Sequence, residues 1–163
     1  IYSNLSIEFN SLISNMKSYL TPWKLLSNKK MASDTQWVID AMNVKTPSHK
    51  TTIGSLSGGN QQKAVIAREI DRDPELLIVS QPTRGLDVGA IEYIRKRIIA
   101  ERDKGKAVIV VSFELDEILD MSDRIAVIYG GAIQGILDPA ETNKQDLGIL
   151  MAGGQLNKEE ANV

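Results

Sequence analysis

Two short apolar runs rich in β-branched residues, "LLIVS" at 76–80 and "KAVIVVS" at 106–112, restrict the possible folds of this chain most strongly. Continuous runs of this kind are typical of strands that are buried on both faces of a parallel sheet. The stretch between them predicts an amphipathic helix that ends near Gly105, with apolar residues at helical spacing: Val88, Ile91, Ile94 and Ile98. A strand, a helix and a strand in this order predict a βαβ unit with a right-handed crossover.

The residues before this unit predict helices. A first helix ends before Pro22 and carries apolar residues at helical spacing, namely Leu5, Phe9, Leu12, Met16 and Leu20. A second helix is expected to begin near Ser33, which has capping-box spacing to Gln36, and to end near Val44. Its apolar residues are Trp37, Val38, Ala41 and Met42.

The residues after this unit predict a smaller set of elements. "ELDEILDMS" at 114–122 favours a short helix, and "RIAVIYGGAIQGIL" at 124–137 favours a hairpin that turns at Gly130 and Gly131. A last helix is expected over residues 142–151. The chain is therefore expected to be an α/β protein with three parts: a helical part (1–72), an α/β part (73–152) and a flexible tail (153–163).

Composition excludes several classes of protein. Of the 163 residues, 42% are hydrophobic and 25% are charged, which is typical of a globular domain. The formal net charge of -2 provides no basic field for nucleic acid, so no nucleic-acid partner is expected. The longest apolar runs are far shorter than the ~20 residues of a membrane span. With no cysteine, the chain has no disulfide and no Cys-ligated zinc.

The motif "LSGGNQQK" at 56–63 follows a loop at 46–55 and opens a third helix, which is expected to end before Pro74. A serine and two glycines at a helix start expose unpaired N–H groups, a hydroxyl and the positive end of the helix dipole, which together suit a phosphate. Ser57, Gly58 and Gly59 are therefore candidate phosphate-binding residues. Taken alone, the same tripeptide also fits a simple N-cap with a flexible turn.

The complete motif resembles the signature sequence of ABC-transporter ATPases, and its "GNQQK" ending resembles the branch that serves sugar and nucleoside importers. Two further motifs stand at separations typical of that family. "DPELLIVSQPTRGLDVGA" at 73–90 is similar to the Walker B strand and D-loop, and "VIVVSFELDE" at 108–117 is similar to the switch region. The resemblance implies part of a P-loop NTPase domain: the helical subdomain with its signature helix, then half of a largely parallel α/β core.

The sequence departs from that family at three catalytic positions. The family's Walker B strand ends in an aspartate that organises magnesium and a glutamate that polarises the hydrolytic water. Ser80 has no charge to offset a metal, and Gln81 can orient a water but cannot accept its proton. Phe113, which is also expected to be a core aromatic, replaces the switch histidine, and His49 lies in the helical-lobe loop instead. The three changes together predict a site with little or no turnover.

The family's Walker A loop, GxxxxGK[ST], cannot lie in residues 1–53, because this stretch contains no glycine. We therefore interpret the chain as a piece of a longer subunit. By resemblance, ATP and Mg²⁺ are cofactors of the complete transporter, and the chain by itself is expected to be inactive. Its two strands are expected to keep an uncovered face or an unpaired edge.

The motifs that act on a neighbouring domain remain intact. In this family two nucleotide-binding domains pack head to tail, and each signature helix covers the ATP held by the other domain. By resemblance, Ser57, Gly58 and Gly59 contact the γ-phosphate of that ATP, with Gln61 nearby. Asp87 in the D-loop lies at the same interface, and it also fits an N-cap of the following helix.

The resemblance narrows to the second, degenerate ATP-binding domain of a tandem importer subunit. It is strongest for bacterial nucleoside importers, with ribose or galactose importers as close competitors. It implies three partners: the first nucleotide-binding domain of the same chain, integral-membrane permease subunits and, indirectly, a substrate-binding lipoprotein. The implied location is the cytoplasmic face of the bacterial plasma membrane.

Two other hypotheses stay open at this point. The chain could be a non-enzymatic module whose helical part, residues 1–44, docks on a membrane subunit. The chromosome-organising and DNA-repair ATPases also share the SGG signature. Those proteins join the signature to long coiled coils and keep the acidic pair. This sequence has no sustained heptads and lacks the acidic pair, which disfavours that hypothesis.

Overall fold

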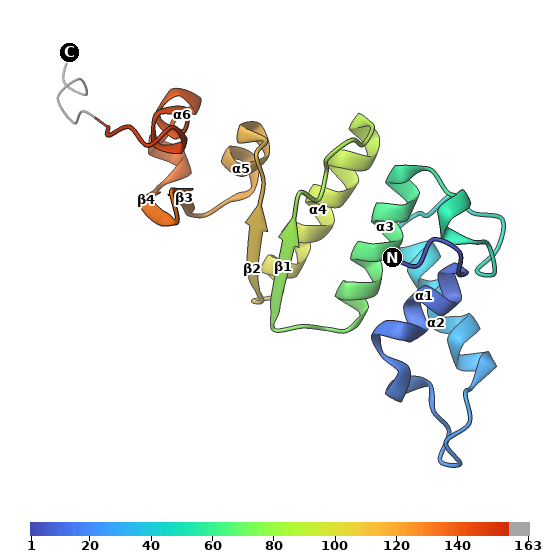
Figure 1. The fold of residues 1–163 in the computed structure, drawn as a ribbon. Coiled ribbons are helices and arrows are strands. Elements are labelled where there is room, and N and C mark those ends of the chain that lie inside the picture. Colours follow the sequence, from blue (N-terminus) through green and yellow to red (C-terminus); the bar gives the residue numbers. More distant parts are fainter. Residues whose placement is uncertain (157–163) are drawn as a thin grey trace. The chain divides into compact units, whose positions relative to one another are not determined.

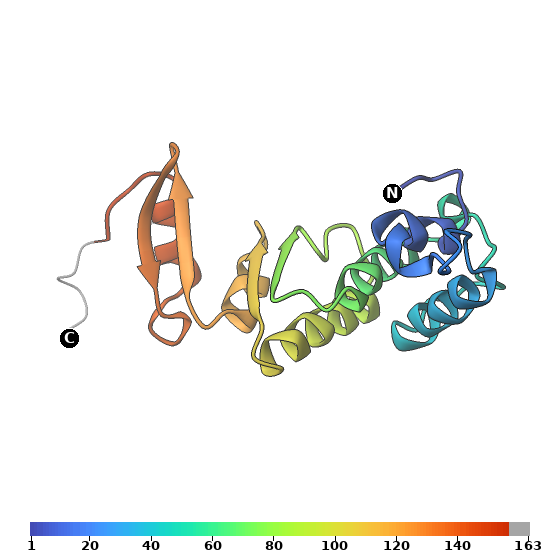
Figure 2. The ribbon, with the colours of Figure 1, turned by 90° about the horizontal axis from the view of Figure 1, so that it is seen from below.

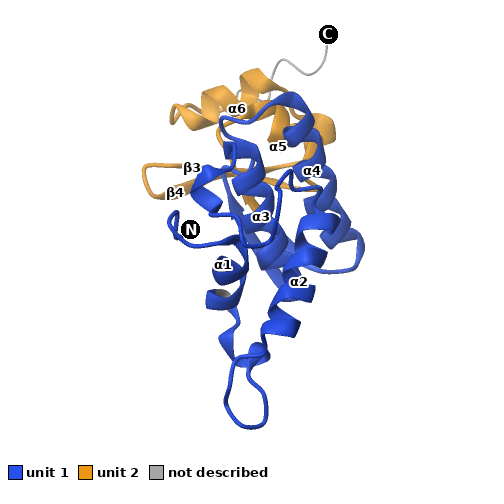
Figure 3. Ribbon diagram, turned by 90° about the vertical axis from the view of Figure 1, so that its right-hand side faces the viewer, with its two compact units in different colours: residues 1–109 blue, residues 110–163 orange. Residues whose placement is uncertain are grey.

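The computed structural model describes residues 1–156 and divides the chain into two compact units, residues 1–109 and 110–163 (Figure 3). The three-part division expected from the sequence, at residues 1–72, 73–152 and 153–163, stays a prediction. Most of the expected tail, residues 157–163, lies outside the described residues.

The first unit begins with helices α1 (Ile7–Ser14), α2 (Asn28–Ala41) and α3 (Gly58–Asp71), which pack on one another (Figure 1). A short 3-10 helix (Met16–Tyr19) follows α1. The core of these helices is apolar and includes Ile7, Leu12, Met31, Val38, Met42, Ile66 and Ile70. The third helix is confirmed within the expected bounds.

The first two helices differ from the sequence-based prediction. The N-cap of helix α2 is Ser27, six residues before Ser33, and its hydroxyl accepts the N–H of Lys30. Ser33 lies inside the helix and donates to the carbonyl of Lys30, so the predicted capping box is wrong. In α1 the predicted apolar stripe is largely wrong as well, because of its members only Leu12 is buried.

Strand β1 (Leu76–Ser80) pairs with strand β2 (Ala107–Val111), and helix α4 (Val88–Asp103) connects them. The two arrows run in the same direction in Figure 1. The predicted order of strand, helix and strand is therefore confirmed. Helix α4 packs against α3 and buries Ile94 and Ile98.

The prediction that the strands are buried on both faces is wrong. In β1 only Leu77 is buried, whereas Leu76 and Ile78 are exposed, Ile78 by 62%. Ile109 in β2 is exposed as well. Helix α4 lies along the sheet (Figure 1), and the opposite face carries these uncovered apolar side chains, as expected for half of a core.

The second unit contains α5 (Leu115–Met121), β3 (Ile125–Tyr129), β4 (Ala132–Leu137) and α6 (Lys144–Met151). β3 and β4 form the predicted antiparallel hairpin, and Gly130 and Gly131 turn it with positive φ angles of 58° and 80°. A two-residue turn of this kind favours glycine at both positions. Helix α6 lies across one face of the hairpin (Figure 2) around a core of Ile125, Val127, Leu147 and Leu150.

None of the helices within residues 1–156 is both long enough and apolar enough to cross a bilayer.

Candidate functional site

An open cavity of about 380 Å³ lies where the N-terminal ends of α3 and α4 meet the segment that follows α2. All of its residues belong to the first unit. They are Asn43, Lys45, Ser57, Gly59, Asn60, Lys63, Asp87, Gly89, Ala90 and Tyr93. The structure therefore brings the signature residues Ser57 and Gly59 together with Asp87 of the predicted D-loop.

Helix α3 opens into this cavity with its N–H groups uncapped. Ser57 is the N-cap residue in extended backbone conformation, but its hydroxyl accepts no backbone N–H of the helix and instead accepts the side-chain amide of Asn60. The first N–H groups of an α-helix have no intrahelical acceptor, so they remain available to a ligand together with the positive helix end. Apart from its chain neighbours and the backbone of its own helix, no atom lies within 4 Å of the place where a side chain would begin at Gly58. A phosphate can approach this backbone closely.

Gly59 lies where the ends of α3 and α4 come together. A Cβ atom at Gly59 would lie 3.4 Å from Ala90 Cβ and 3.6 Å from Asp87 Oδ2, which is full van der Waals contact. Asp87 is the N-cap of α4, since its Oδ1 accepts the N–H of Ala90 at 2.9 Å. The predicted N-cap role of Asp87 is confirmed, and Asp87 lines the same cavity as Ser57 and Gly59, whereas its place at an interface with a second nucleotide-binding domain stays a prediction.

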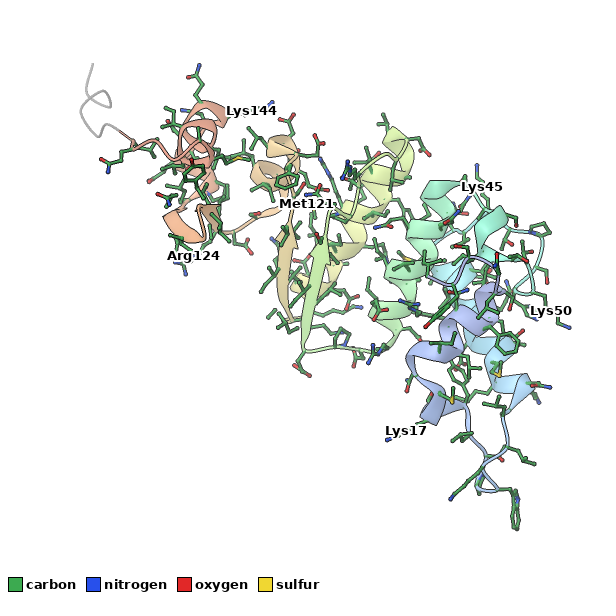
Figure 4. All side chains as sticks on the ribbon, viewed as in Figure 1. Lys17, Lys45, Lys50, Met121, Arg124 and Lys144 are labelled. Carbon is green, nitrogen blue, oxygen red and sulfur yellow. The ribbon has the colours of Figure 1, made fainter. Side chains whose placement is uncertain are left out.

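Two lysines on the cavity wall were missed from the sequence. Lys63 Nζ lies 4.8 Å from the centre of the Tyr93 ring, and the Tyr93 hydroxyl donates to the carbonyl of Ala41. Lys45, labelled in Figure 4, lies in the segment after α2. With the helix end, these two cations outweigh the single charge of Asp87 and favour an anion in the cavity. Lys63 belongs to the motif at 56–63, but its contact with Tyr93 could not be predicted without the position of α4.

Gln61, the remaining residue predicted for this site, turns away from it. Its Nε2 donates to the carbonyl of Leu56 at 2.8 Å, so the side chain braces the residue before the motif. A contact of Gln61 with nucleotide stays a prediction.

The end of β1 carries no carboxylate. Ser80 is exposed, and Gln81 adopts a positive φ of 51°, a left-handed conformation that is uncommon for residues other than glycine, asparagine and aspartate. The chain thus turns sharply at Gln81, the position that the motif resemblance assigns to a catalytic glutamate. Within residues 1–156, no group of three acidic or histidine side chains could hold a metal ion. A weak metal contact of Ser80 and a water-orienting role of Gln81 stay predictions.

Phe113 belongs to the second unit and is not a core aromatic. Its side chain is 72% exposed, so the expectation that it packs in the core is wrong. It lies in the bend before α5, where the hydroxyl of Ser112 accepts the N–H of Glu114 at 3.0 Å. An aromatic ring at the switch position can neither donate nor accept a proton.

The fold is that of part of an ABC ATPase domain, a P-loop NTPase of mixed α/β architecture. A dimeric ATP-binding cassette in a post-hydrolysis state bound to ADP and Pi matches with a TM-score of 0.73 and 21% identity, over 85% of this chain and 59% of that one. A metal-chelate type ABC transporter in an inward-facing conformation matches with a TM-score of 0.74 and 15% identity, over 94% and 60%.

In sequence the chain is similar to ATP-binding proteins of bacterial importers. It is 61% identical over 149 residues to the galactose/methyl galactoside import ATP-binding protein MglA of Haemophilus influenzae, covering 90% of this chain and 29% of that protein. It is 59% identical over 142 residues to the nucleoside import ATP-binding protein NupA of Lactococcus lactis subsp. cremoris, covering 87% and 28%. No protein-family model matches the chain.

The chain is therefore homologous to ABC transporter ATPases, and it spans less than a third of the length of these curated relatives. The resemblance of its three motifs to ABC ATPases, and to the branch of sugar and nucleoside importers, is confirmed at this level.

Proposed function

We propose that the chain is the C-terminal part of the second ATP-binding domain of an importer subunit for galactose or nucleosides. Its role there is to complete the ATP site of the partner domain. One contrast carries the proposal: Ser57, Gly59 and Asp87 share an open, cationic cavity, whereas the strand end at Ser80 and Gln81 has no carboxylate.

The residues of the cavity suit a terminal phosphate. The N–H groups at the start of α3 and the Ser57 hydroxyl donate hydrogen bonds to phosphate oxygens, and Lys45 and Lys63 add positive charge. ATP bound by the partner domain supplies the phosphoryl group that is transferred to water. The chain's own strand end orients a water through Gln81 at most, because an amide cannot accept the proton. Mg²⁺ in the complete site then depends on carboxylates of the partner domain.

The solute belongs to the same proposal. Identities of 61% to a galactose relative and 59% to a nucleoside relative do not separate the two solutes. The residues of this chain face nucleotide, whereas a transported solute is recognised by permease and binding-protein surfaces. Transport assays with galactose and with a nucleoside distinguish them directly.

The proposed partners include the permease subunits, at the cytoplasmic face of the membrane. The loop between α1 and α2 offers an apolar surface to such a partner: Leu20, Trp23 and Leu25 are exposed, Trp23 by 84%. Large apolar side chains that cluster on an exposed loop are typical of an interaction surface. Partner binding through this loop does not depend on the cavity at α3.

The substitution Gly58→Ala tests the proposed phosphate site. A methyl group at Gly58 meets no atom within 4 Å, so the free energy of unfolding is expected to stay constant or rise by up to about 1 kcal/mol. The same methyl group narrows the approach of a phosphate, so the ATP turnover of the complete subunit in its transporter is expected to fall by about tenfold.

Gly148→Ala in α6 is the matched control, since a Cβ atom there also meets nothing within 4 Å and the residue is far along the chain from the motif. It is expected to change ATP turnover by less than about twofold and the free energy of unfolding by less than about 1 kcal/mol. If Gly58→Ala and Gly148→Ala turn over ATP equally well, the non-enzymatic interaction module becomes the better hypothesis.

A further inference from the structure

The side-chain amide of Asn60 links the signature serine to the segment that follows α2. Asn60 Oδ1 accepts the backbone N–H of Lys45 at 2.9 Å, and Asn60 Nδ2 donates to Ser57 Oγ at 2.9 Å. Ser57 and Asn60 belong to the motif at 56–63, whereas Lys45 lies eleven residues before its start. In the fold they form one chain of hydrogen bonds along the cavity wall.

The direction of both hydrogen bonds is fixed by chemistry. A backbone N–H can only donate, so the atom of Asn60 that faces Lys45 must be the carbonyl oxygen. The NH₂ group of the same amide then faces Ser57, and the serine oxygen is the acceptor. A flipped amide would place two donors against each other at Lys45.

This arrangement decides what the Ser57 hydroxyl can do. A serine at an N-cap usually accepts an N–H of its own helix, but Ser57 makes no such bond. Asn60 instead occupies the acceptor side of the hydroxyl, which leaves the serine proton to be donated elsewhere. The cavity is the open side of Ser57, so the proton is available to an anion there.

We propose that Asn60 is a positioning residue, which turns the Ser57 hydroxyl outward as a donor and sets its orientation by the position of the Lys45 backbone. The inference rests on the proposed function, because the outward proton matters only if an anion is bound in the cavity. It adds a physical link between the end of α2 and the phosphate-binding end of α3. A shift of the α2 end relative to α3 breaks this link and removes the orientation of the serine.

A double-mutant cycle in the complete transporter tests this role. Asn60→Ala is expected to lower ATP turnover about fivefold, the equivalent of one neutral hydrogen bond. In a Ser57→Ala background, which is itself expected to be about tenfold slower, Asn60→Ala is expected to cost less than about twofold. An effect of Asn60→Ala that is equal in both backgrounds overturns the proposal, since Asn60 then acts without Ser57.

Asn60→Asp separates positioning from simple tethering. Aspartate keeps an acceptor for the Lys45 N–H, so a mere tether between the two segments survives. Its second oxygen cannot donate to Ser57 and instead accepts the serine proton, which turns the hydroxyl inward. Turnover is expected to fall at least about tenfold, further than in Asn60→Ala, and the same change in the Ser57→Ala background measures the effect of the added charge alone. If Asn60→Asp has the turnover of the unchanged protein, Asn60 is only a tether.

Amide hydrogen exchange at Lys45 provides a readout that does not depend on ATP. Exchange at Lys45 is expected to become faster in Asn60→Ala and to stay slow in Ser57→Ala and Asn60→Asp. Asn143→Ala is the control for a structural asparagine, because Asn143 caps α6 by accepting the N–H groups of Gln145 and Asp146. It is expected to have the same effect on turnover in both Ser57 backgrounds.

The outcomes distinguish this inference from the proposed function. If Ser57→Ala leaves turnover unchanged, the proposed phosphate site fails, and the inference fails with it. If Ser57→Ala slows turnover but Asn60→Ala adds its full effect to it, the proposed function stands and the positioning role alone is wrong.

Discussion

Replacing Ser57 with arginine is expected to lower the ATP turnover of the complete importer subunit by a factor on the order of 100 or more. The long side chain fills the mouth of the cavity where the phosphate is proposed to bind, and it adds a cation to the positive end of α3. Folding is expected to be preserved, since Ser57 is exposed and its hydroxyl caps no backbone N–H of the helix that it precedes, accepting the side-chain amide of Asn60 instead. Steady-state ATP hydrolysis by the assembled transporter is the measurement.

Two further variants make this result specific. Ser33→Arg makes the same chemical change on the exposed face of α2, outside the cavity, and is expected to leave turnover within about twofold of the unchanged protein. Gln81→Ala removes the amide at the strand end and is expected to change turnover by less than about threefold. If Gln81→Ala abolishes turnover while Ser57→Arg does not, the proposed asymmetry between the two ATP sites is reversed.

The elements after residue 56 could be predicted from the sequence because each has a local cause. The β-branched runs predict β1 and β2, the helical spacing of apolar residues predicts α4, and the Gly130–Gly131 turn predicts the hairpin, all without help from distant residues. The first two helices could not be placed in this way. Helix α2 buries Thr35 together with Met31 and Val38, and a threonine on the buried face does not register in a count of apolar residues.

Helix α1 shows the same effect with an asparagine. Asn10 is buried because its amide bonds the backbone of Tyr2, Leu5 and Ser6, so the polar side chain occupies a core position while apolar Phe9 is exposed. A hydrophobic pattern cannot find a buried polar residue that is satisfied by local backbone groups.

The site was predictable only as far as its motifs reach. Ser57, Gly59 and Asp87 carry recognisable patterns, and the fold brings them to one cavity. Lys45 belongs to no recognisable motif. It contributes a backbone N–H to Asn60, and the position of that N–H depends on where α2 ends. In the sequence, Tyr93 is indistinguishable from any other residue of an amphipathic helix, and its contact with Lys63 appears only in the fold. Contacts that depend on the packing of two helices are therefore what the sequence alone did not reveal.

The second large effect is expected at Glu101, which is fully buried near the end of α4. Its Oε1 accepts from Lys104 Nζ at 2.6 Å and its Oε2 from Lys106 Nζ at 2.9 Å, and Lys106 also pairs with Asp73. Glu101→Gln leaves the largely buried Lys106 without one of its two anions, and the free energy of unfolding is expected to fall by about 3 kcal/mol. Urea denaturation followed by far-ultraviolet circular dichroism measures this change, because the first unit is largely helical.

The same carboxylate predicts a pH dependence of stability. Burial raises the pKa of Glu101, but the hydrogen bonds from Lys104 and Lys106 outweigh burial and hold the pKa below its ordinary value of 4.5. A carboxyl group with a lowered pKa in the folded state binds fewer protons than in the unfolded state. Its contribution is therefore complete above the unfolded pKa and is lost as the pH falls through the folded pKa. The midpoint of urea unfolding is expected to decline below about pH 4.5, and this decline is expected to be smaller in Glu101→Gln.

Glu92→Gln on the same helix is the control that separates a buried from an exposed ion pair. Glu92 also has a lowered pKa, chiefly because Lys96 donates a hydrogen bond to it at 2.6 Å, but both side chains are exposed. Water screens such a pair, so Glu92→Gln is expected to leave the midpoint of urea unfolding close to that of the unchanged protein. If the two substitutions destabilise the chain equally, burial of Glu101 does not strengthen its pairing, and the junction between α4 and β2 is held by the backbone hydrogen bonds from Lys104 and Lys106 to the Glu101 carbonyl.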